Sequence, residues 1–166
     1  MHLDAIFARR SIRQYTGKPV SKTQITKLLE AGMAAPSSKD RKPWHFVVIE
    51  DRATLDRLAE THPHGKMLST AAAAIAVCGD TNISLDFWIQ DCAAATENIL
   101  VAVAGLGLGA VWLGCHPREE RVSAIREVLA IPGNIGILSL ISIGHPGESK
   151  EPRTQYNEER VHHEKW

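Results

Sequence analysis

A long apolar segment in the second half of the chain constrains the fold more than any other feature. Residues 84–104 have a helical pattern with hydrophobic side chains on nearly every side (Leu85, Trp88, Ile89, Cys92, Ile99, Leu100, Val103). A helix without a polar face lies at the centre of its domain or at a subunit interface. The apolar run over 99–115 is shorter than the roughly 20 residues that a membrane-spanning helix needs, and it contains four glycines. We therefore expect a buried helix, a turn and a strand there.

The rest of the chain alternates between helical and strand patterns. Ser21 and Gln24 have the spacing of a capping box, Asp51 is a helix-capping residue, and Pro117 suits the first turn of a helix. Helices are expected over 3–9, 22–34, 52–61, 66–71, 84–104 and 118–129. Strands are expected over 45–49, 74–78, 110–113 and 137–143. This order predicts about four strands with helices on both faces, an α+β or α/β sandwich. The 166 residues fit one domain.

Charge is balanced overall but unevenly distributed. The chain has 19 Lys plus Arg and 19 Asp plus Glu, so its formal charge is zero. That balance gives no general attraction for nucleic acid or an anionic membrane. Residues 1–42, however, hold nine basic and three acidic residues. This basic quarter indicates either an anion-binding site or a solvated helical face.

The cysteines and the first residues bear on the compartment. Cys78, Cys92 and Cys115 have no CxxC spacing, and they are expected to be buried small hydrophobes rather than a disulfide framework. Asp4 and two arginines interrupt the first ten residues, which therefore do not match a signal peptide. We expect a cytoplasmic protein.

Three weak motifs are set aside. The glycines at 105, 107 and 109 follow a helix and precede a strand, which is the reverse of a dinucleotide fingerprint. His162 and His163 are adjacent and lack a third ligand nearby, so no metal site is expected. Cys115 and His116 are sequence neighbours, which rarely reach the geometry of a nucleophile and its base.

Four segments point to an anionic, flat ligand. Arg9, Arg10, Ser11 and Arg13 lie within five residues, and alternate positions of an extended segment share one face, where guanidiniums and a hydroxyl suit a phosphate. The alternative is a solvated basic turn. The other segments are a Pro-Ser-Ser turn at 36–38, a glycine-flanked strand at 109–114 that allows close approach to the backbone, and a second cationic spot at 150–153.

Together these segments resemble the nitroreductase family of FMN-dependent enzymes, and the likeness runs from RRSIRQY to the KEPRTQYNEERVHHEKW tail. The resemblance implies a nitroreductase-like α+β fold with a mostly antiparallel sheet. It also implies an intertwined homodimer that binds FMN at the subunit interface. Residues 1–166 would form a single domain, with 145–166 as an arm that packs on the partner subunit.

The resemblance also implies a role for each matching position. Arg9, Ser11 and Arg153 match residues that hold the FMN phosphate, with Arg10 beside them, and Arg13 matches a cation near flavin N1. The remaining matches are Pro36, Ser37 and Ser38 from the other subunit, Leu113 and Gly114 near flavin N5, and Lys66 near the pyrimidine. The family often has Asn and Gln where Asp40 and Lys42 stand. These two residues either pair with each other, or Lys42 contacts the ring edge.

The implied activity is transfer of hydride from NADH or NADPH through FMN to nitroaromatic, quinone or similar acceptors in a ping-pong scheme. No side chain is required as an acid or base, so no catalytic residue is named. A flavin-binding sensor or storage protein and a reductive dehalogenase-like flavoenzyme are the alternatives.

Overall fold

The computed structural model describes residues 3–166. Its helices are α1 (Asp4–Ala8), α2 (Lys22–Met33), α3 (Arg52–Thr61), α4 (Trp88–Gly105) and α5 (Glu119–Leu129). Its strands are β1 (Trp44–Ile49), β2 (Ala73–Asp80), β3 (Gly109–Gly114) and β4 (Ile135–Gly144). Short 3-10 turns lie at Ser38–Asp40, Lys66–Ser69 and Glu158–Arg160.

In the described part of the chain, the four strands form one sheet in the order β1-β2-β4-β3. Each neighbouring pair is antiparallel. The expected fold class, an antiparallel sheet of about four strands flanked by helices, is confirmed. Strand β3 is an edge strand, and this position leaves one of its sides open to other segments.

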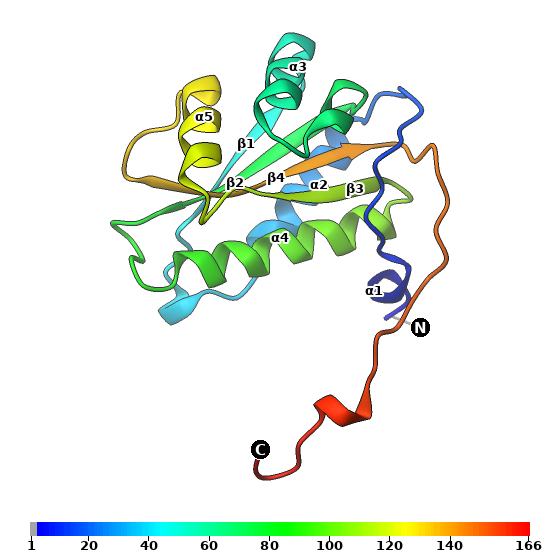
Figure 1. Cartoon of the computed structure of the whole chain (residues 1–166), viewed down its shortest axis with the longest axis vertical. Helices are drawn as coiled ribbons and strands as arrows, with labels where there is room; N and C mark the ends of the chain where they lie inside the picture. The colour runs from blue at the N-terminus through cyan, green and yellow to red at the C-terminus, as the bar shows by residue number, and fades with distance from the viewer. Residues whose placement is uncertain (1–2) are drawn as a thin grey trace.

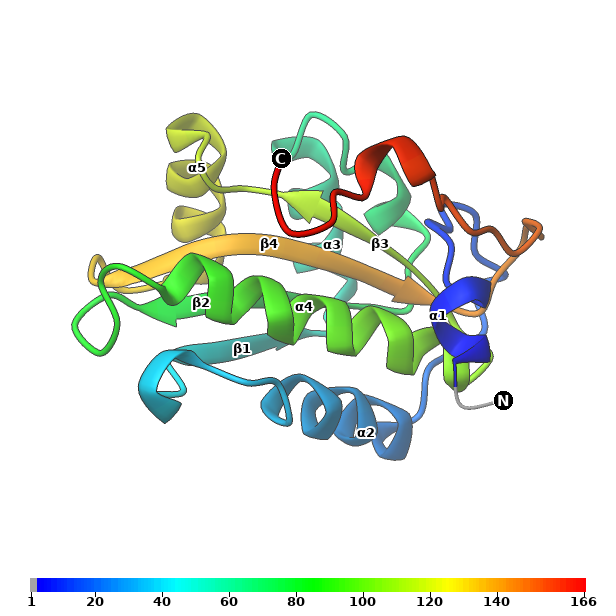
Figure 2. The same ribbon diagram turned by 90° about the horizontal axis from the view of Figure 1, so that it is seen from below.

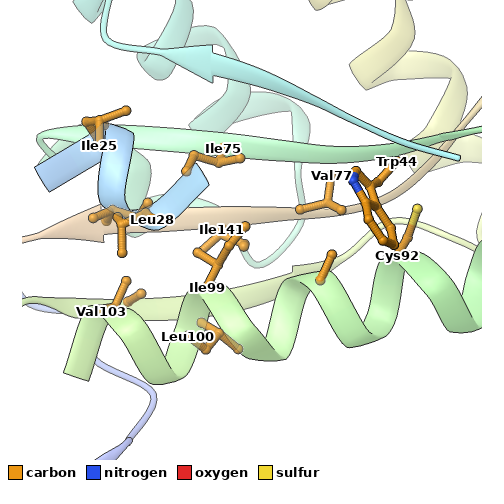
Figure 3. Close-up of a cluster of buried hydrophobic side chains, with 14 of the residues drawn as sticks. Ile25, Leu28, Trp44, Ile75, Val77, Cys92, Ile99, Leu100, Val103 and Ile141 are labelled. Carbon is orange, nitrogen blue, oxygen red and sulfur yellow. The ribbon is translucent and has the colours of Figure 1, made fainter. Parts of the chain in front are cut away.

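Helices cover both faces of the sheet (Figures 1 and 2). One apolar layer joins α2 and α4 to the sheet through side chains such as Leu28, Ile75, Ile99 and Ile141, which Figure 3 shows in close-up. The second layer joins α3 and α5 to the opposite face. A fully buried aliphatic side chain contributes roughly 1.5–3 kcal/mol, so these two layers hold the sheet between them.

Helix α4 begins later than the sequence indicates. Residues 84–87 precede it, Leu85 is exposed, and the helix starts at Trp88. The cause is a turn organised by Asp80, which accepts hydrogen bonds from the main-chain N–H of Asn82 at its side chain and of Ser84 at its carbonyl. The buried side of α4 packs on the sheet, while its other side is only partly covered.

The capping predictions are confirmed at two helices. Gln24 and Ser21 form the reciprocal capping box at the start of α2. Asp51 accepts a hydrogen bond of 2.8 Å from the Thr54 N–H at the start of α3. The prediction for Pro117 is wrong, because Arg118 caps α5 and Pro117 lies before the cap.

The two ends of the chain run side by side along the open side of β3 (Figure 1). Residues 14–16 exchange main-chain hydrogen bonds with residues 145–147. Residues 148–153 also contact the first segment, and after them the C-terminal tail leaves the body of the molecule and extends away from the sheet (Figure 1). Its large side chains, including Tyr156 and Trp166, are exposed.

Candidate functional site

A cationic cavity of about 280 Å³ lies where the first and last segments meet. Its lining combines residues from two ends of the chain (Arg9, Arg10, Ser11, Arg13, Lys150, Arg153). The structure thus brings together all five of the residues that the sequence predicts for the phosphate and the nearby cation. The cavity's positive charge and its guanidinium donors suit a multiply charged oxyanion.

The cavity is anchored to the edge of the sheet. Ser11 pairs with Ala110 of β3 in a parallel bridge, and the Ile12 N–H donates to the Ala110 carbonyl at 2.9 Å. Gly109 permits this approach, because a Cβ there would lie 2.7 Å from Cγ2 of Ile12. The arginine segment is therefore held extended. Alternate residues of an extended segment share one face, which agrees with the three lining residues Arg9, Ser11 and Arg13.

The segment 148–153 closes the cavity. Lys150 Nζ donates to the Ser11 carbonyl at 2.6 Å and lies 3.3 Å from Glu148 Oε1. Arg10 donates to the Glu151 carbonyl, and the Arg153 N–H donates to the Phe7 carbonyl at 3.2 Å. The sequence shows Lys150 only as part of a cationic spot, because no local pattern indicates that it reaches Ser11.

Glu148 is the carboxylate among these cations. Its Oε1 accepts a hydrogen bond of 2.6 Å from the Arg13 main-chain N–H. That hydrogen bond, followed by the contacts with Lys150, lowers the pKa of Glu148. Glu148 therefore stays ionised and fixes the backbone of Arg13, a residue that lines the cavity.

Tyr15 joins the arginine segment to strand β4. Its hydroxyl lies 3.0 Å from the Ile12 carbonyl and 2.6 Å from Ser142 Oγ. Burial raises the pKa of Tyr15 to about 12, so the phenol stays protonated and can donate. A Cβ at Gly144 would lie 2.8 Å from Cδ1 of Tyr15, which explains glycine at the end of β4.

A second group of polar contacts lies at the C-terminal end of β3. The Gly114 carbonyl accepts hydrogen bonds from His62 at 3.1 Å and from Arg121 at 3.0 Å. His62 and Lys66 line a shallow hollow beside it. Gly114 is four positions beyond Ala110, which bridges to Ser11, so this group lies about 13 Å along the strand from the cationic cavity.

The Pro-Ser-Ser turn lies elsewhere in the chain. The Ser38 N–H donates to Asp91 Oδ1 at 2.8 Å, which places the turn at the start of α4. Arg9, which lines the cationic cavity, pairs through Nε with Glu97 near the middle of that helix at 3.1 Å, and no residue of the turn is among those that line the cavity. Within one chain, Pro36, Ser37 and Ser38 therefore do not reach the cavity.

The loop after this turn is tightly folded. Lys39, Asp40 and Lys42 all have positive φ angles near 50°, a conformation rare for residues other than glycine. The Lys42 N–H donates to Ser37 Oγ at 2.9 Å, and Lys42 Nζ lies 2.9 Å from Asp40 Oδ2. Of the two alternatives for Asp40 and Lys42, the structure has the pairing of the two side chains.

The cysteine prediction is confirmed for the three residues concerned. Cys78, Cys92 and Cys115 are free and buried. Burial raises the pKa of each thiol to about 12, so none has the thiolate character of a nucleophile.

Within residues 3–166, no cluster of three His, Cys, Asp or Glu could hold a metal, and no helix is long and apolar enough to cross a membrane.

Comparison with known proteins places this antiparallel α+β fold in a well-populated structural class. A solved structure of an inferred NADH dehydrogenase/NAD(P)H nitroreductase from Parabacteroides distasonis is 44% identical, with a TM-score of 0.96. The match covers 99% of this chain and 98% of that one.

The chain belongs to the nitroreductase family, whose profile matches residues 6–89 and 65–145. An inferred NADH dehydrogenase/NAD(P)H nitroreductase of Archaeoglobus fulgidus is 48% identical over 99% of this chain and 98% of its own length. An inferred nitroreductase of Desulfovibrio desulfuricans, solved in complex with FMN, is 32% identical, with a TM-score of 0.85 over 99% of this chain and 96% of that one. The family and the enzyme class predicted from the sequence are confirmed.

Proposed function

We propose that the protein is an FMN-dependent NAD(P)H oxidoreductase that reduces nitroaromatic, quinone or similar electron-poor acceptors. The observation that carries this proposal is the cationic cavity formed by Arg9, Arg10, Ser11, Arg13, Lys150 and Arg153. The D. desulfuricans relative binds FMN, a ligand that ends in a phosphate. A phosphate at this cavity would receive charge-assisted hydrogen bonds from several side chains at once.

Strand β3 offers a second point of fit. A Cβ added at Gly114 would meet no atom within 4 Å, so packing within the chain does not require glycine there. A flat ring that approaches the backbone would require it. A ligand laid along β3 can thus place its phosphate beside Ser11 and its ring beside Leu113 and Gly114.

The other predicted contacts come from outside this cavity. Pro36, Ser37 and Ser38 lie by the start of α4 and do not line the cavity, so a second copy of the chain is the natural source of these residues. The partly exposed apolar side of α4 and the extended tail supply surface for such a homodimer. Residues 1–166 would then form one domain, with 145–166 as an arm that packs on the partner.

When bound, FMN supplies hydride acceptance from NADH or NADPH and hydride donation to the acceptor. The chain's own residues bind and orient it. Arg9, Ser11, Lys150 and Arg153 would hold the phosphate, while Arg13 and Lys66 would supply positive charge to the ring, whose reduced form carries negative charge. The proposed scheme is ping-pong, and it assigns no described side chain a role as proton donor or acceptor.

The test is the absorption spectrum of the purified protein, followed anaerobically with NADH and with NADPH. We expect a flavin band near 450 nm (roughly, the usual flavin absorption) that is bleached by at least one nucleotide and restored by a nitroaromatic or quinone. Slow bleaching by both nucleotides would indicate a sensor or storage protein. A protein that purifies without flavin and binds no added FMN would overturn the proposal.

A further inference from the structure

The carbonyl of Gly114 is held from two sides. His62, the residue that caps the end of α3, places Nε2 3.1 Å from this oxygen. Arg121 of α5 donates to the same oxygen at 3.0 Å. Two elements far apart in sequence thus converge on one main-chain atom at the end of an edge strand.

His62 is fixed as a neutral donor. Its Nδ1 accepts a hydrogen bond from the His64 N–H at 3.2 Å, so the ring proton resides on Nε2, which faces the Gly114 carbonyl. The side chain is only 2% exposed. Burial, together with the charge of Arg121, lowers the pKa of His62. The imidazole therefore has one orientation and one tautomer, both set by backbone contacts.

Arg121 holds its position at an energetic cost. Its Nε is buried and, among the described residues, has no hydrogen-bond partner. A buried donor without a partner is unfavourable, so packing alone does not account for an arginine here. The favourable contact that the structure shows for this guanidinium is its hydrogen bond to the Gly114 carbonyl.

Gly114 faces the open side of β3. In an antiparallel strand, alternate residues direct both N–H and C=O to the same side. Ala110 directs its carbonyl outward to Ile12, and Gly114, four residues later, directs its own groups to that same side. Gly114, which His62 and Arg121 hold, therefore has its N–H on the open side of β3 and has no side chain to cover it.

We propose that His62 and Arg121 are positioning residues that fix the end of β3 against the ring of the bound flavin. They act through the Gly114 carbonyl and do not touch the ring themselves. This inference rests on the proposed function. It predicts that the two residues affect the ring end of the ligand and leave the phosphate end unchanged.

The experiment compares FMN with riboflavin, which lacks the phosphate, in titrations of full-length protein depleted of flavin. The variants are His62→Leu and Arg121→Met, which remove the donors. His62→Gln retains an N–H at the same reach. Arg126→Met is the matched control, because Arg126 also lies on α5 and also donates to carbonyls, but those of Ile131 and Pro132. The midpoint potential of bound FMN and the thermal midpoint are measured for each.

We expect His62→Leu and Arg121→Met to raise the Kd for FMN and for riboflavin by the same factor, about three- to tenfold, and to shift the midpoint potential. His62→Gln should keep the Kd values and the midpoint potential close to those of the wild type, and Arg126→Met should change neither the Kd values nor the potential. Donor-removing variants that lower the thermal midpoint but keep the wild-type Kd values and potential would overturn the inference. Wild-type protein that binds neither flavin would overturn the proposed function and this inference together.

Discussion

The ε-ammonium of Lys150 lies 2.6 Å from the main-chain oxygen of Ser11. This contact joins residues 139 positions apart and closes the cationic cavity from the C-terminal side. It also brings the ammonium group of Lys150 beside the arginine segment that follows α1. The anion site is therefore assembled from the two ends of the chain rather than from one motif.

Lys150→Met should weaken FMN binding without unfolding the protein. The change removes one charge-assisted interaction with the phosphate, each of which is worth about 1.5–3 kcal/mol, so the Kd for FMN should rise about 10- to 100-fold. Fluorescence titration measures this. Lys27→Met is the control, because Lys27 is exposed on α2 and does not line the cavity. An equal change in the two variants would contradict the assignment.

Two glycines of β3 should respond in opposite ways to alanine. Gly109→Ala places a methyl group 2.7 Å from Ile12 Cγ2, so it should lower the free energy of unfolding by about 1–3 kcal/mol. Gly114→Ala meets no protein atom and should leave stability within about 0.5 kcal/mol of the wild type. It should nevertheless raise the Kd for FMN, because the methyl group would stand between the backbone and the ring.

Urea unfolding and flavin titration of both variants separate these effects. A Gly114→Ala variant that binds FMN as tightly as the wild type would show that no ring lies at the end of β3.

The buried His62 should make stability depend on pH in a defined window. Its pKa is lowered in the folded chain, by burial first, so below about pH 6.5 the unfolded chain binds a proton that the folded chain does not. The free energy of unfolding should therefore fall as the pH drops below about 6.5 and stay constant above it, as far as this group is concerned.

The measurement is the difference between wild type and His62→Gln in urea unfolding from pH 5 to 8. The variant should lose part of the dependence on pH. His45→Gln, which changes an exposed histidine of β1, should keep it. A wild-type profile identical to that of His62→Gln would contradict a buried neutral imidazole.

Removing residues 155–166 should shift the protein from dimer to monomer and lower its flavin content. The tail carries Tyr156 and Trp166, whose side chains are exposed in the single chain and suit burial against a partner. The truncation retains Lys150 and Arg153, so the cavity lining remains. Size-exclusion chromatography at micromolar concentration measures the change. Wild-type protein that elutes as a monomer would contradict the proposed homodimer.

Local patterns were sufficient to predict most of the fold. The order of helices and strands and the capping box at Ser21 depend on neighbours within a few residues, whereas the pairing of Ser11 with Ala110 does not. The start of α4 could not be predicted in this way, because Leu85 fits the apolar spacing of the helix, and only the turn at Asp80 excludes residues 84–87 from it.

The site was predictable only in part. The arginine cluster is a local motif, and its position beside Arg153 agrees with the expectation from family resemblance. The hydrogen bonds from Lys150 to Ser11 and from His62 to Gly114 cross 139 and 52 residues. Such pairings follow from sheet topology, which no local pattern contains. The separation of Ser37 and Ser38 from the cavity is likewise absent from local patterns, because it follows from the contact of Ser38 with Asp91 of α4.

The most direct test of the account is the ratio of the Kd values for riboflavin and FMN. If the cationic cavity takes the FMN phosphate, the wild-type protein should bind FMN at least about 100-fold more tightly than riboflavin. Arg153→Met should reduce that ratio by weakening FMN alone. Equal affinities for the two flavins in the wild type, or an equal loss of both in Arg153→Met, would contradict the central claim.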